Sequence, residues 1–363
     1  MPSNLLRLDA RLYFAPHSKP NLSEEFVTAP AIRTTVVGSY PVPEWLIALP
    51  SQQALIDATK VVFKIQELAG IDVIADGELY RWDVNHPDTN GMIEYFIRPM
   101  DGIRSRVTRS DAEEFRRLEG MGFRSAPAGV VEGVIGEGTL SLSEDYRRAR
   151  ACTAHPMKFT LTGPHMLCKT LMDHHYGNLP DLAMAIGHAL AQQVGEIDSE
   201  VIQIDEANIT GHAEEGEWAA AAINVVLDAA TQAKEKGVHM CFGNYGGQSI
   251  QRGTWQKLIG FINRLHCDHV LLEMAFRGYD ELQYFKDELD PRIGIGLGVI
   301  DIKVNTVESA DEVASRIEAA TKIVGDGRIK WVNPDCGFWM NKRSIADRKI
   351  AALVAGRDLF LGR

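Results

Sequence analysis

The stretch from residue 201 to 244 decides the fold class, because it contains VIQIDEA (201–207), EWAAAAINVVLDAATQAKEKG (217–237) and VHMCFGN (238–244). The two outer runs are apolar and of strand length, as expected for strands that a parallel sheet buries on both faces. The middle run is rich in helix formers, and we predict a helix that stops at Gly237 with lysines in its last turn. Strand, helix and strand in this order indicate a parallel α/β protein.

The same pattern extends along most of the chain. Six further β-like runs occupy residues 34–40, 72–78, 157–164, 269–276, 292–301 and 329–337. Helix-like stretches separate most of them, and 179–197 places an apolar stripe at spacings of three and four: Leu182, Ile186, Leu190, Val194 and Ile197. Eight strands alternating with helices predict a (β/α)₈ TIM barrel over residues 34–363. Residues 1–33 are predicted as an N-terminal arm, and the charged segment at about 85–150 as an insertion near the barrel mouth.

Composition narrows the class of protein. The 363 residues are 45% hydrophobic and 24% charged, with a net charge of −11, which argues against nucleic acid as a partner. No apolar run approaches the ~20 residues that span a bilayer, and the N-terminus lacks a signal-peptide layout, so we expect a cytoplasmic protein without a membrane partner. Five sparse cysteines make a poor disulfide framework, and their thiols are then core residues, metal ligands or nucleophiles.

Chemically distinctive residues fall at the ends of the predicted strands. Because the carboxyl ends of barrel strands converge on one face, these side chains are expected to meet there. They are Ser39, Glu78, Asp205, His239, Cys241, Glu273, Asp301 and Cys336.

Four of these residues suit a metal. His239 and Cys241 alternate on one strand and so point to the same side, while Glu273 ends the apolar run VLLE and Cys336 lies in NPDCGF. One nitrogen, two sulfurs and one oxygen fit tetrahedral Zn²⁺. Packing of a His-x-Cys pair in the core remains the alternative at this point. A zinc with two thiolates can bind an incoming thiol and hold it as a nucleophilic thiolate, which predicts alkyl transfer to sulfur.

Several motifs together resemble the C-terminal catalytic barrel of cobalamin-independent methionine synthase. They occur in the family's order between about residues 33 and 360: GSYP, DGELYRWD, LTGP, IQIDEAN, HMCFGNY, LLE, GVIDIK and WVNPDCGF. The resemblance implies zinc-dependent transfer of a methyl group to the homocysteine thiolate. It places His239, Cys241, Glu273 and Cys336 at the family's ligand positions.

The resemblance also implies roles in substrate binding. Ser39 matches a turn that contacts the amino acid's carboxylate, and Glu78 and Asp205 match acidic residues that hold its ammonium. A buried ammonium does need a carboxylate partner. The alternative is that these carboxylates cap a helix or pair with a nearby arginine such as Arg81. Asp301 would orient a zinc ligand or a proton donor without binding the metal itself.

Three departures from the family concern the methyl donor. The 363 residues account for one barrel, whereas relatives that use folate polyglutamate carry a second, N-terminal barrel. The segment HMLCKTLMDHHYGN (165–178) lacks the family's tryptophan, and Lys303 replaces a histidine that is thought to protonate the departing amine. A donor that leaves without protonation needs no such acid. We therefore predict a single-barrel relative that uses methylcobalamin, a corrinoid protein or an unusual folate.

Two other functions remain open. The chain also resembles the epoxyalkane:coenzyme M transferases, in which a zinc-bound thiolate opens an epoxide. In that case the basic residues near the mouth would meet the sulfonate or protonate the alkoxide: Lys303, His165, Lys169, His174 or His175. The third hypothesis is a barrel with a structural zinc that acts as a binding partner in a methyl-transfer complex, although a site that includes Glu273 argues against it.

Overall fold

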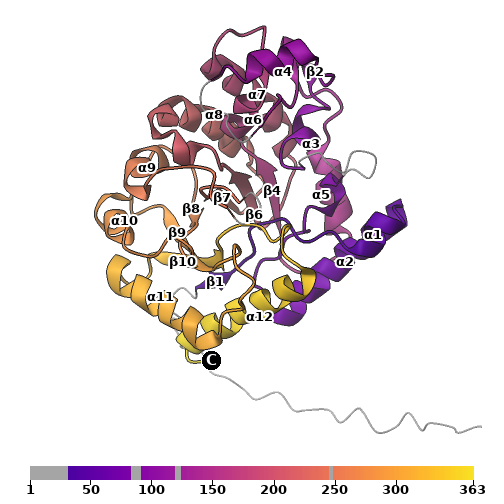
Figure 1. Ribbon diagram of the computed structural model, residues 1–363. Coiled ribbons are helices and arrows are strands. Elements are labelled where there is room, and N and C mark those ends of the chain that lie inside the picture. Colours follow the sequence, from indigo (N-terminus) through magenta and orange to yellow (C-terminus); the bar gives the residue numbers. More distant parts are fainter. Residues whose placement is uncertain (1–31, 83–90, 119–123, 245–247) are drawn as a thin grey trace, which may run out of the picture. The chain divides into compact units, whose positions relative to one another are not determined.

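The computed structural model describes residues 32–82, 91–118, 124–244 and 248–363 (Figure 1). Most of the predicted arm at residues 1–33 lies outside these ranges, as do residues 85–90 and 119–123 of the predicted insertion. The domain boundaries drawn from the sequence therefore stay predictions. Within the described ranges, no helix is both long enough and apolar enough to cross a membrane.

The central sheet is a closed ring of parallel strands. Seven strands follow the order β1, β10, β9, β8, β7, β6 and β4. Their bounds are β1 (Arg33–Thr34), β4 (Lys158–Thr162), β6 (Val201–Asp205), β7 (Glu235–Met240), β8 (His269–Leu272), β9 (Gly294–Ile300) and β10 (Ile329–Pro334). Between β1 and β4, Val73 pairs with Thr35 and Ile74 pairs with Met157, both in parallel. These two bridges complete the ring, and the predicted (β/α)₈ barrel is confirmed.

The second barrel segment is much shorter than the predicted run at 72–78. The Asp72 carboxylate accepts the Thr34 backbone N–H at 2.7 Å, which ties the segment to β1 at its start. Gly77 and Glu78 then adopt positive φ angles of 78° and 59°. The parallel bridges end at Ile74, and the left-handed backbone at Gly77 and Glu78 then turns the chain, so that no regular strand continues through it.

Helices surround the strands in Figure 1. They are α2 (Gln52–Ala69), α7 (Leu179–Val194), α8 (Gly216–Ala229), α9 (Trp255–Ile262), α10 (Leu282–Glu288), α11 (Ala310–Val324) and α12 (Arg343–Phe360). The apolar stripe predicted over residues 179–197 is fully buried, although helix α7 ends at Val194 and Ile197 lies beyond it. Helix α11 begins with a capping box in which Ser309 and Glu312 satisfy each other's backbone N–H groups. Burial of such faces against the sheet is what stabilises the barrel.

Helix α8 is shorter than the sequence predicts. It ends at Ala229 instead of near Gly237, and strand β7 already begins at Glu235. The register of β7 against β6 begins with Glu235 opposite Val201, just after an ion pair of 2.7 Å between Lys234 and Glu200. Sheet pairing thus outweighs the helix propensity of the segment. The lysines interpreted as a helix C-terminus lead into a strand.

A second, smaller sheet lies beside the barrel mouth. Strands β2 (Asp101–Arg104), β3 (Val130–Gly136) and β5 (Met172–Asp173) form it in the order β2–β3–β5. Helices α3 (Glu94–Ile97), α4 (Arg109–Phe115) and α5 (Leu142–Arg150) belong to the same part of the chain. Strand β5 lies in the connection after β4, beyond α6 (Pro164–Lys169). The small sheet is therefore attached at the carboxyl end of β4, on the face where a barrel carries its active site.

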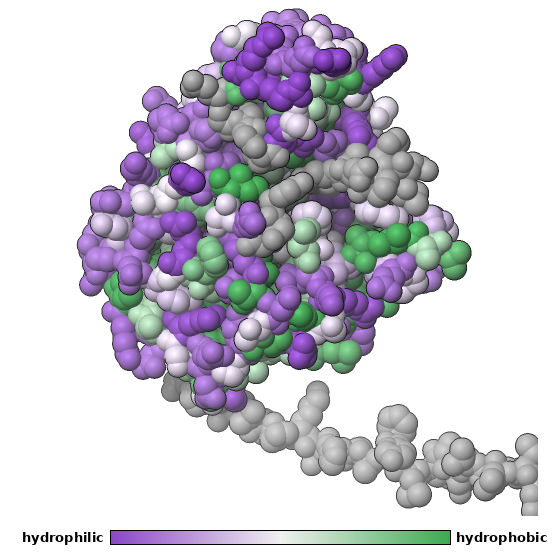
Figure 2. Space-filling model, viewed as in Figure 1, coloured by the Kyte–Doolittle hydropathy of each residue, from purple (hydrophilic) through white to green (hydrophobic). Residues whose placement is uncertain are grey.

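Apolar side chains gather over the short helix α1 (Glu44–Ala48) in Figure 2. Trp45, Ile47 and Leu49 are exposed there. Helix α1 follows β1, so these side chains belong to the same end of the barrel as the small sheet.

Candidate metal centre and active site

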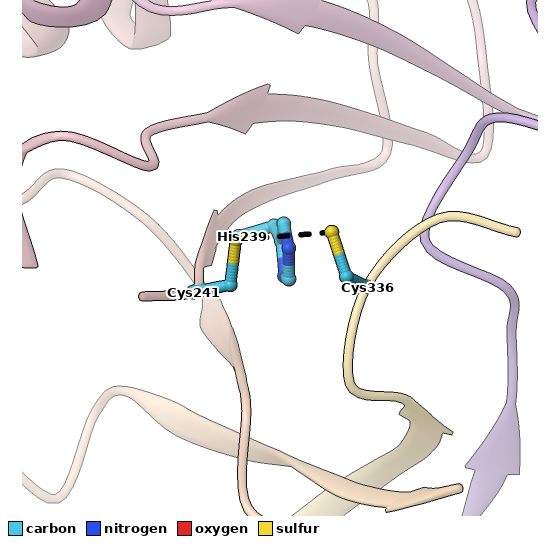
Figure 3. A group of neighbouring side chains, drawn as sticks. All are labelled: His239, Cys241 and Cys336. Carbon is cyan, nitrogen blue, oxygen red and sulfur yellow. Dashed lines mark hydrogen bonds between the residues drawn. The ribbon is translucent and has the colours of Figure 1, made fainter. Parts of the chain in front are cut away.

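Three of the predicted ligands come together at the barrel mouth. His239 is on β7, Cys241 lies just beyond that strand, and Cys336 lies just beyond β10; their side chains point toward one another (Figure 3). One ligand atom from each lies within 4.8 Å of the others, and the two sulfurs are 3.7 Å apart. Two sulfurs bound to one tetrahedral zinc at about 2.3 Å would be roughly 3.8 Å apart. The spacing of the free thiols therefore fits a shared metal ion.

The orientation of His239 also fits a ligand. Its Nδ1 is 3.2 Å from the backbone carbonyl oxygen of Leu271 on the neighbouring strand, so Nδ1 is assigned as the N–H donor. Its Nε2 is buried and has no hydrogen-bond partner among the described residues. A buried nitrogen lone pair without a partner is costly in the core and is what a metal would satisfy.

The two thiols share one hydrogen bond, and their pKa values move apart. The contact with Cys336 lowers the pKa of Cys241 well below its usual value, against the effect of burial, and His239 lowers it further. The same contact raises the pKa of Cys336. Burial disfavours protonation of His239, yet Cys241 and Asp205 raise its pKa. One thiolate is thus favoured even before any cation arrives, which suits a site for a soft divalent metal.

Glu273, the predicted fourth ligand, lies outside this group of three. Its Oε2 accepts the backbone N–H of Phe242 at 2.7 Å, and its Oε1 pairs with the Lys303 ammonium. Both side chains are buried. Burial and the charge of Cys241 raise the pKa of Glu273, and Lys303 opposes that rise. The carboxylate therefore lies near the thiols but is held by a cation.

Two glycines leave room for the Ser39 and Glu78 side chains near the site: Gly337 for Ser39, and Gly38 for Glu78. A Cβ on Gly337 would lie 2.0 Å from the Ser39 hydroxyl oxygen, and a Cβ on Gly38 would lie 2.2 Å from Oε1 of Glu78. Both distances are far below van der Waals contact, so only glycine allows these approaches. The turn GSYP is thereby placed between the cysteine loop after β10 and the Glu78 carboxylate.

Glu78 is fixed by its backbone and by two partners. It has the only positive φ among the non-glycine residues that the structure describes. Its Oε1 accepts from the Thr160 hydroxyl at 2.7 Å, and its Oε2 is 3.1 Å from Arg81. The pairing with Arg81 that the sequence left as an alternative is present. Strained backbone of this kind is typical of residues whose position matters for function.

Asp205 lies beside His239, its register partner on the neighbouring strand. Gln203 donates to the Asp205 carboxylate at 2.7 Å and accepts from the Lys158 ammonium at 2.6 Å. Burial raises the pKa of Asp205 to about 7, where the Glu78 charge adds to the rise and His239 opposes it. Burial likewise lowers the pKa of Lys158 to about 7. A buried chain of polar groups thus lies inside the barrel next to the candidate metal ligands.

Asp301 supports a turn. Its carboxylate accepts the backbone N–H of Lys303 at 2.8 Å. Its own N–H donates to Glu308 at 2.9 Å, and its carbonyl oxygen accepts from Lys349 at 2.8 Å. Among the described contacts, none joins the Asp301 side chain to the three candidate ligands. It therefore orients the segment that carries Lys303.

Asp335 is a site residue that the sequence reasoning missed. Its Oδ1 accepts the backbone N–H groups of Met274 and Ala275 at 2.9 and 2.8 Å, and its Oδ2 accepts that of Phe276 at 2.7 Å. These bonds tie the loop after Glu273 to the residue before Cys336. The signal was an acidic residue next to a candidate ligand in NPDCGF, and such neighbours often orient ligands.

Two of the basic residues after β4, His165 and Lys169, are already paired with one carboxylate. Glu215 accepts from His165 at 2.7 Å and from Lys169 at 2.8 Å. Trp218 of α8 stacks against His165 with ring centroids 5.0 Å apart, so a tryptophan reaches this loop from another element. Glu214 and Glu215 also form a second metal-capable group with His212. The Lys169 ammonium on Glu215 disfavours a cation there.

Comparison with known families shows one match along most of the chain. The family described as "Cobalamin-independent synthase, Catalytic domain" matches residues 32–356. The methionine synthase of Sulfurisphaera tokodaii is 28% identical over 351 residues, which cover 91% of this chain and 93% of that protein. The methionine synthase of Saccharolobus solfataricus is 27% identical over 343 residues, covering 90% and 94%.

Among solved structures, a B12-independent methionine synthase from a Shewanella species, in complex with selenomethionine, has a similar fold. Its TM-score is 0.73 at 22% sequence identity, covering 92% of this chain and 98% of that one. This likeness supports the barrel architecture independently of the strand pairing.

Proposed function

The chain belongs to the cobalamin-independent synthase family, and on this premise we propose that it transfers a methyl group to the sulfur of homocysteine to form methionine. The observation that carries the proposal is the unpartnered Nε2 of His239 beside two cysteine sulfurs 3.7 Å apart. The two relatives named methionine synthases support the reaction type, because the match covers 93% and 94% of their length.

We propose Zn²⁺ as the metal, held by His239, Cys241 and Cys336. One imidazole and two thiolates form a donor set that zinc favours in tetrahedral sites. When bound there, zinc lowers the pKa of an incoming thiol and keeps it as a thiolate at neutral pH. The chain's own contribution is orientation, because the Leu271 carbonyl fixes the imidazole and a hydrogen bond joins the two sulfurs.

We propose that the amino acid lies between β1, the Glu78 turn and β6. Glu78, whose side chain is 8% exposed, and the buried Asp205 would together offer carboxylates to its ammonium, and the charge of Glu78 adds to the raised pKa of Asp205. The Ser39 hydroxyl lies against Gly337, one residue after Cys336, and would meet the substrate carboxylate. The substrate thiol is then directed at the three ligands, and positioning of this kind accounts for much of the rate enhancement in two-substrate reactions.

For the donor, we propose a methylcorrinoid. Lys303, which stands where the family has a histidine, forms a buried ion pair with Glu273. Cobalt leaves methylcobalamin as Co(I) without needing a proton, so such a donor suits the site. A folate donor is the other outcome that the experiment must be able to show.

The test uses zinc-loaded protein with methylcobalamin, following the cobalt absorbance in parallel with homocysteine and with 2-mercaptoethanesulfonate. Demethylation with homocysteine alone, with methionine as product, is the expected result. If homocysteine is inert with methylcobalamin and with methyltetrahydrofolate, the proposed reaction is wrong. Epoxypropane with 2-mercaptoethanesulfonate then tests the epoxide-opening alternative. A protein that binds zinc but none of these thiols would instead fit the hypothesis of a non-enzymatic binding partner.

A further inference from the structure

The barrel interior contains a lysine that the proposed reaction does not yet use. Lys158, the first residue of β4, is only 1% exposed and is one of the largest side chains that the core buries completely. Barrel interiors are usually filled by branched apolar side chains. The Lys158 ammonium donates to the neutral amide of Gln203, at 2.6 Å from Oε1, and it forms no ion pair with any residue that the structure describes. Burying an ammonium in this way is costly, so packing alone does not account for a lysine at this position.

The Gln203 side chain, on β6, is completely buried and uses both ends of its amide. Its Oε1 accepts from Lys158, while its Nε2 donates to Oδ1 of Asp205 at 2.7 Å and to the carbonyl oxygen of Val37 at 2.8 Å. An ammonium can only donate, and the oxygens that face Nε2 accept. All three contacts therefore require the same orientation of the amide.

These contacts join two parts of the proposed amino-acid site. Asp205 is one of the carboxylates proposed for the substrate ammonium. Val37 lies two residues before Ser39, which is proposed to meet the substrate carboxylate. Gln203 thus connects the end of β6 with the segment that leads from β1 into the GSYP turn.

Loss of the ammonium would leave this connection incomplete. Oε1 of Gln203 would be buried without a donor, and an unsatisfied buried acceptor costs more free energy than an average hydrogen bond contributes. The amide would reduce this cost by moving toward another donor. Its N–H contacts with Asp205 and Val37 would then weaken, and both ends of the amino-acid site would lose their support.

We propose that Lys158 is a positioning residue: through Gln203 it holds the Asp205 carboxylate and the β1 turn in place to recognise the ammonium and the carboxylate of an amino-acid substrate. This inference rests on the proposed function, because it takes the substrate to be an amino-acid thiol. It is independent of the methyl donor and of the number of protein ligands on the metal.

The test compares the binding of two thiols to the zinc-loaded protein by isothermal titration calorimetry. Homocysteine carries an ammonium and a carboxylate, whereas 2-mercaptoethanol carries neither. In Lys158→Met, the Kd for homocysteine should rise about tenfold or more, and the Kd for 2-mercaptoethanol should change less than about twofold. Zinc content should equal that of the unchanged protein. A loosened barrel would instead weaken the binding of both thiols, and thermal unfolding of each variant measures that effect separately.

A double-variant cycle shows whether the lysine acts through Gln203. Gln203→Met should weaken homocysteine binding at least as much as Lys158→Met does. The double variant should bind homocysteine no more weakly than Gln203→Met alone, because the two residues act in series. The matched control is Gln193→Met on α7, since this buried amide also accepts an N–H, from Leu142 at 3.0 Å, and donates to a carboxylate, Glu137 at 2.6 Å. It should leave both thiol affinities unchanged.

Gln203→Glu carries the test if Lys158→Met does not fold. This variant keeps the shape of the side chain and gives Lys158 a carboxylate partner, but it removes the donor to Asp205 and places a second carboxylate beside it. We expect the Kd for homocysteine to rise about tenfold or more, with 2-mercaptoethanol binding unchanged. Unchanged homocysteine affinity in Gln203→Glu would contradict the proposed role.

The outcomes separate this inference from the proposed function. The inference is wrong if Lys158→Met weakens the binding of both thiols equally, if it leaves homocysteine affinity unchanged, or if its full effect adds to that of Gln203→Met. If the unchanged protein binds homocysteine no more tightly than 2-mercaptoethanol, the amino-acid site and the proposed substrate are themselves wrong, and the inference fails with them.

Discussion

The sulfur atoms of Cys241 and Cys336 lie 3.7 Å apart although 95 residues separate them in the chain. They follow strands β7 and β10, with β8 and β9 between these strands in the sheet. The curvature of the barrel therefore brings two loops to one point that neither could reach alone.

Replacing Cys336 by serine should abolish zinc binding without unfolding the barrel. The variant keeps a similar side-chain volume and loses one of two thiolate donors, so metal content should fall from about one equivalent to near zero. Cys152→Ser, at a half-exposed cysteine outside the site, is the matched control. Metal analysis and circular dichroism give the two readouts, and a zinc-replete Cys336→Ser would remove the ligand assignment.

Asp335→Asn should weaken metal binding through the loop that Asp335 anchors. An asparagine side chain has one acceptor oxygen and one NH₂ donor group. At least one of the three backbone N–H groups at residues 274–276 would therefore lie against this NH₂ group and lose its acceptor. We expect a loss of about 10- to 100-fold in zinc affinity, as for other residues that orient ligands. Asp326→Asn, in the exposed turn before β10, is the control. Equal zinc affinity in the two variants would contradict the anchoring role.

Gly38→Ala should impair substrate binding without touching the metal. The added methyl group would lie 2.2 Å from Oε1 of Glu78, so the carboxylate must move. If Glu78 holds the ammonium, the KM for homocysteine should rise by about tenfold or more in Gly38→Ala and in Glu78→Gln. Zinc content should be unchanged in both. A normal KM in Glu78→Gln would show that another group holds the amino acid.

Asp72→Asn should destabilise the barrel at neutral pH but not at strongly acid pH. Hydrogen bonds from Thr34 and Arg357 lower the pKa of Asp72 below its usual 3.8, although burial opposes this. A carboxyl group with a lowered folded-state pKa contributes stability above its unfolded-state pKa and loses it as the pH falls through the folded-state value. Because Asp72 is partly exposed, we expect about 1–2 kcal/mol of unfolding free energy at pH 7.

Urea unfolding at pH 7 and near pH 3 measures this difference. The gap between Asp72→Asn and the unchanged protein should narrow at the lower pH, where the wild-type carboxylate itself becomes protonated. Asp287→Asn, on the exposed side of α10, should show no gap at either pH. A gap that is the same at both pH values would mean that the carboxylate charge contributes nothing.

Much of the fold could be predicted because burial leaves a local signature. The strand runs and the stripe along α7 are buried in the core, and buried positions require apolar side chains. The pattern of apolar residues therefore predicts the barrel from the chain alone. The end of α8 could not be predicted in this way. Lys234 and Glu235 are helix-forming residues, but Lys234 pairs with Glu200 and Glu235 lies opposite Val201 of strand β6. Pairing with a distant strand is not encoded in the segment itself.

The candidate site shows the same division. The sequence by itself determined the barrel, the family, and the set of donors at the strand ends. Residue type decides which side chains can bind a metal, and the two-residue period of a strand decides toward which face each side chain points. Only the tertiary structure decided which donors meet: His239, Cys241 and Cys336 converge, while Glu273 turns to Lys303. The physical reason is that contacts between strands far apart in the chain depend on how the ring closes and on which buried charge needs a partner.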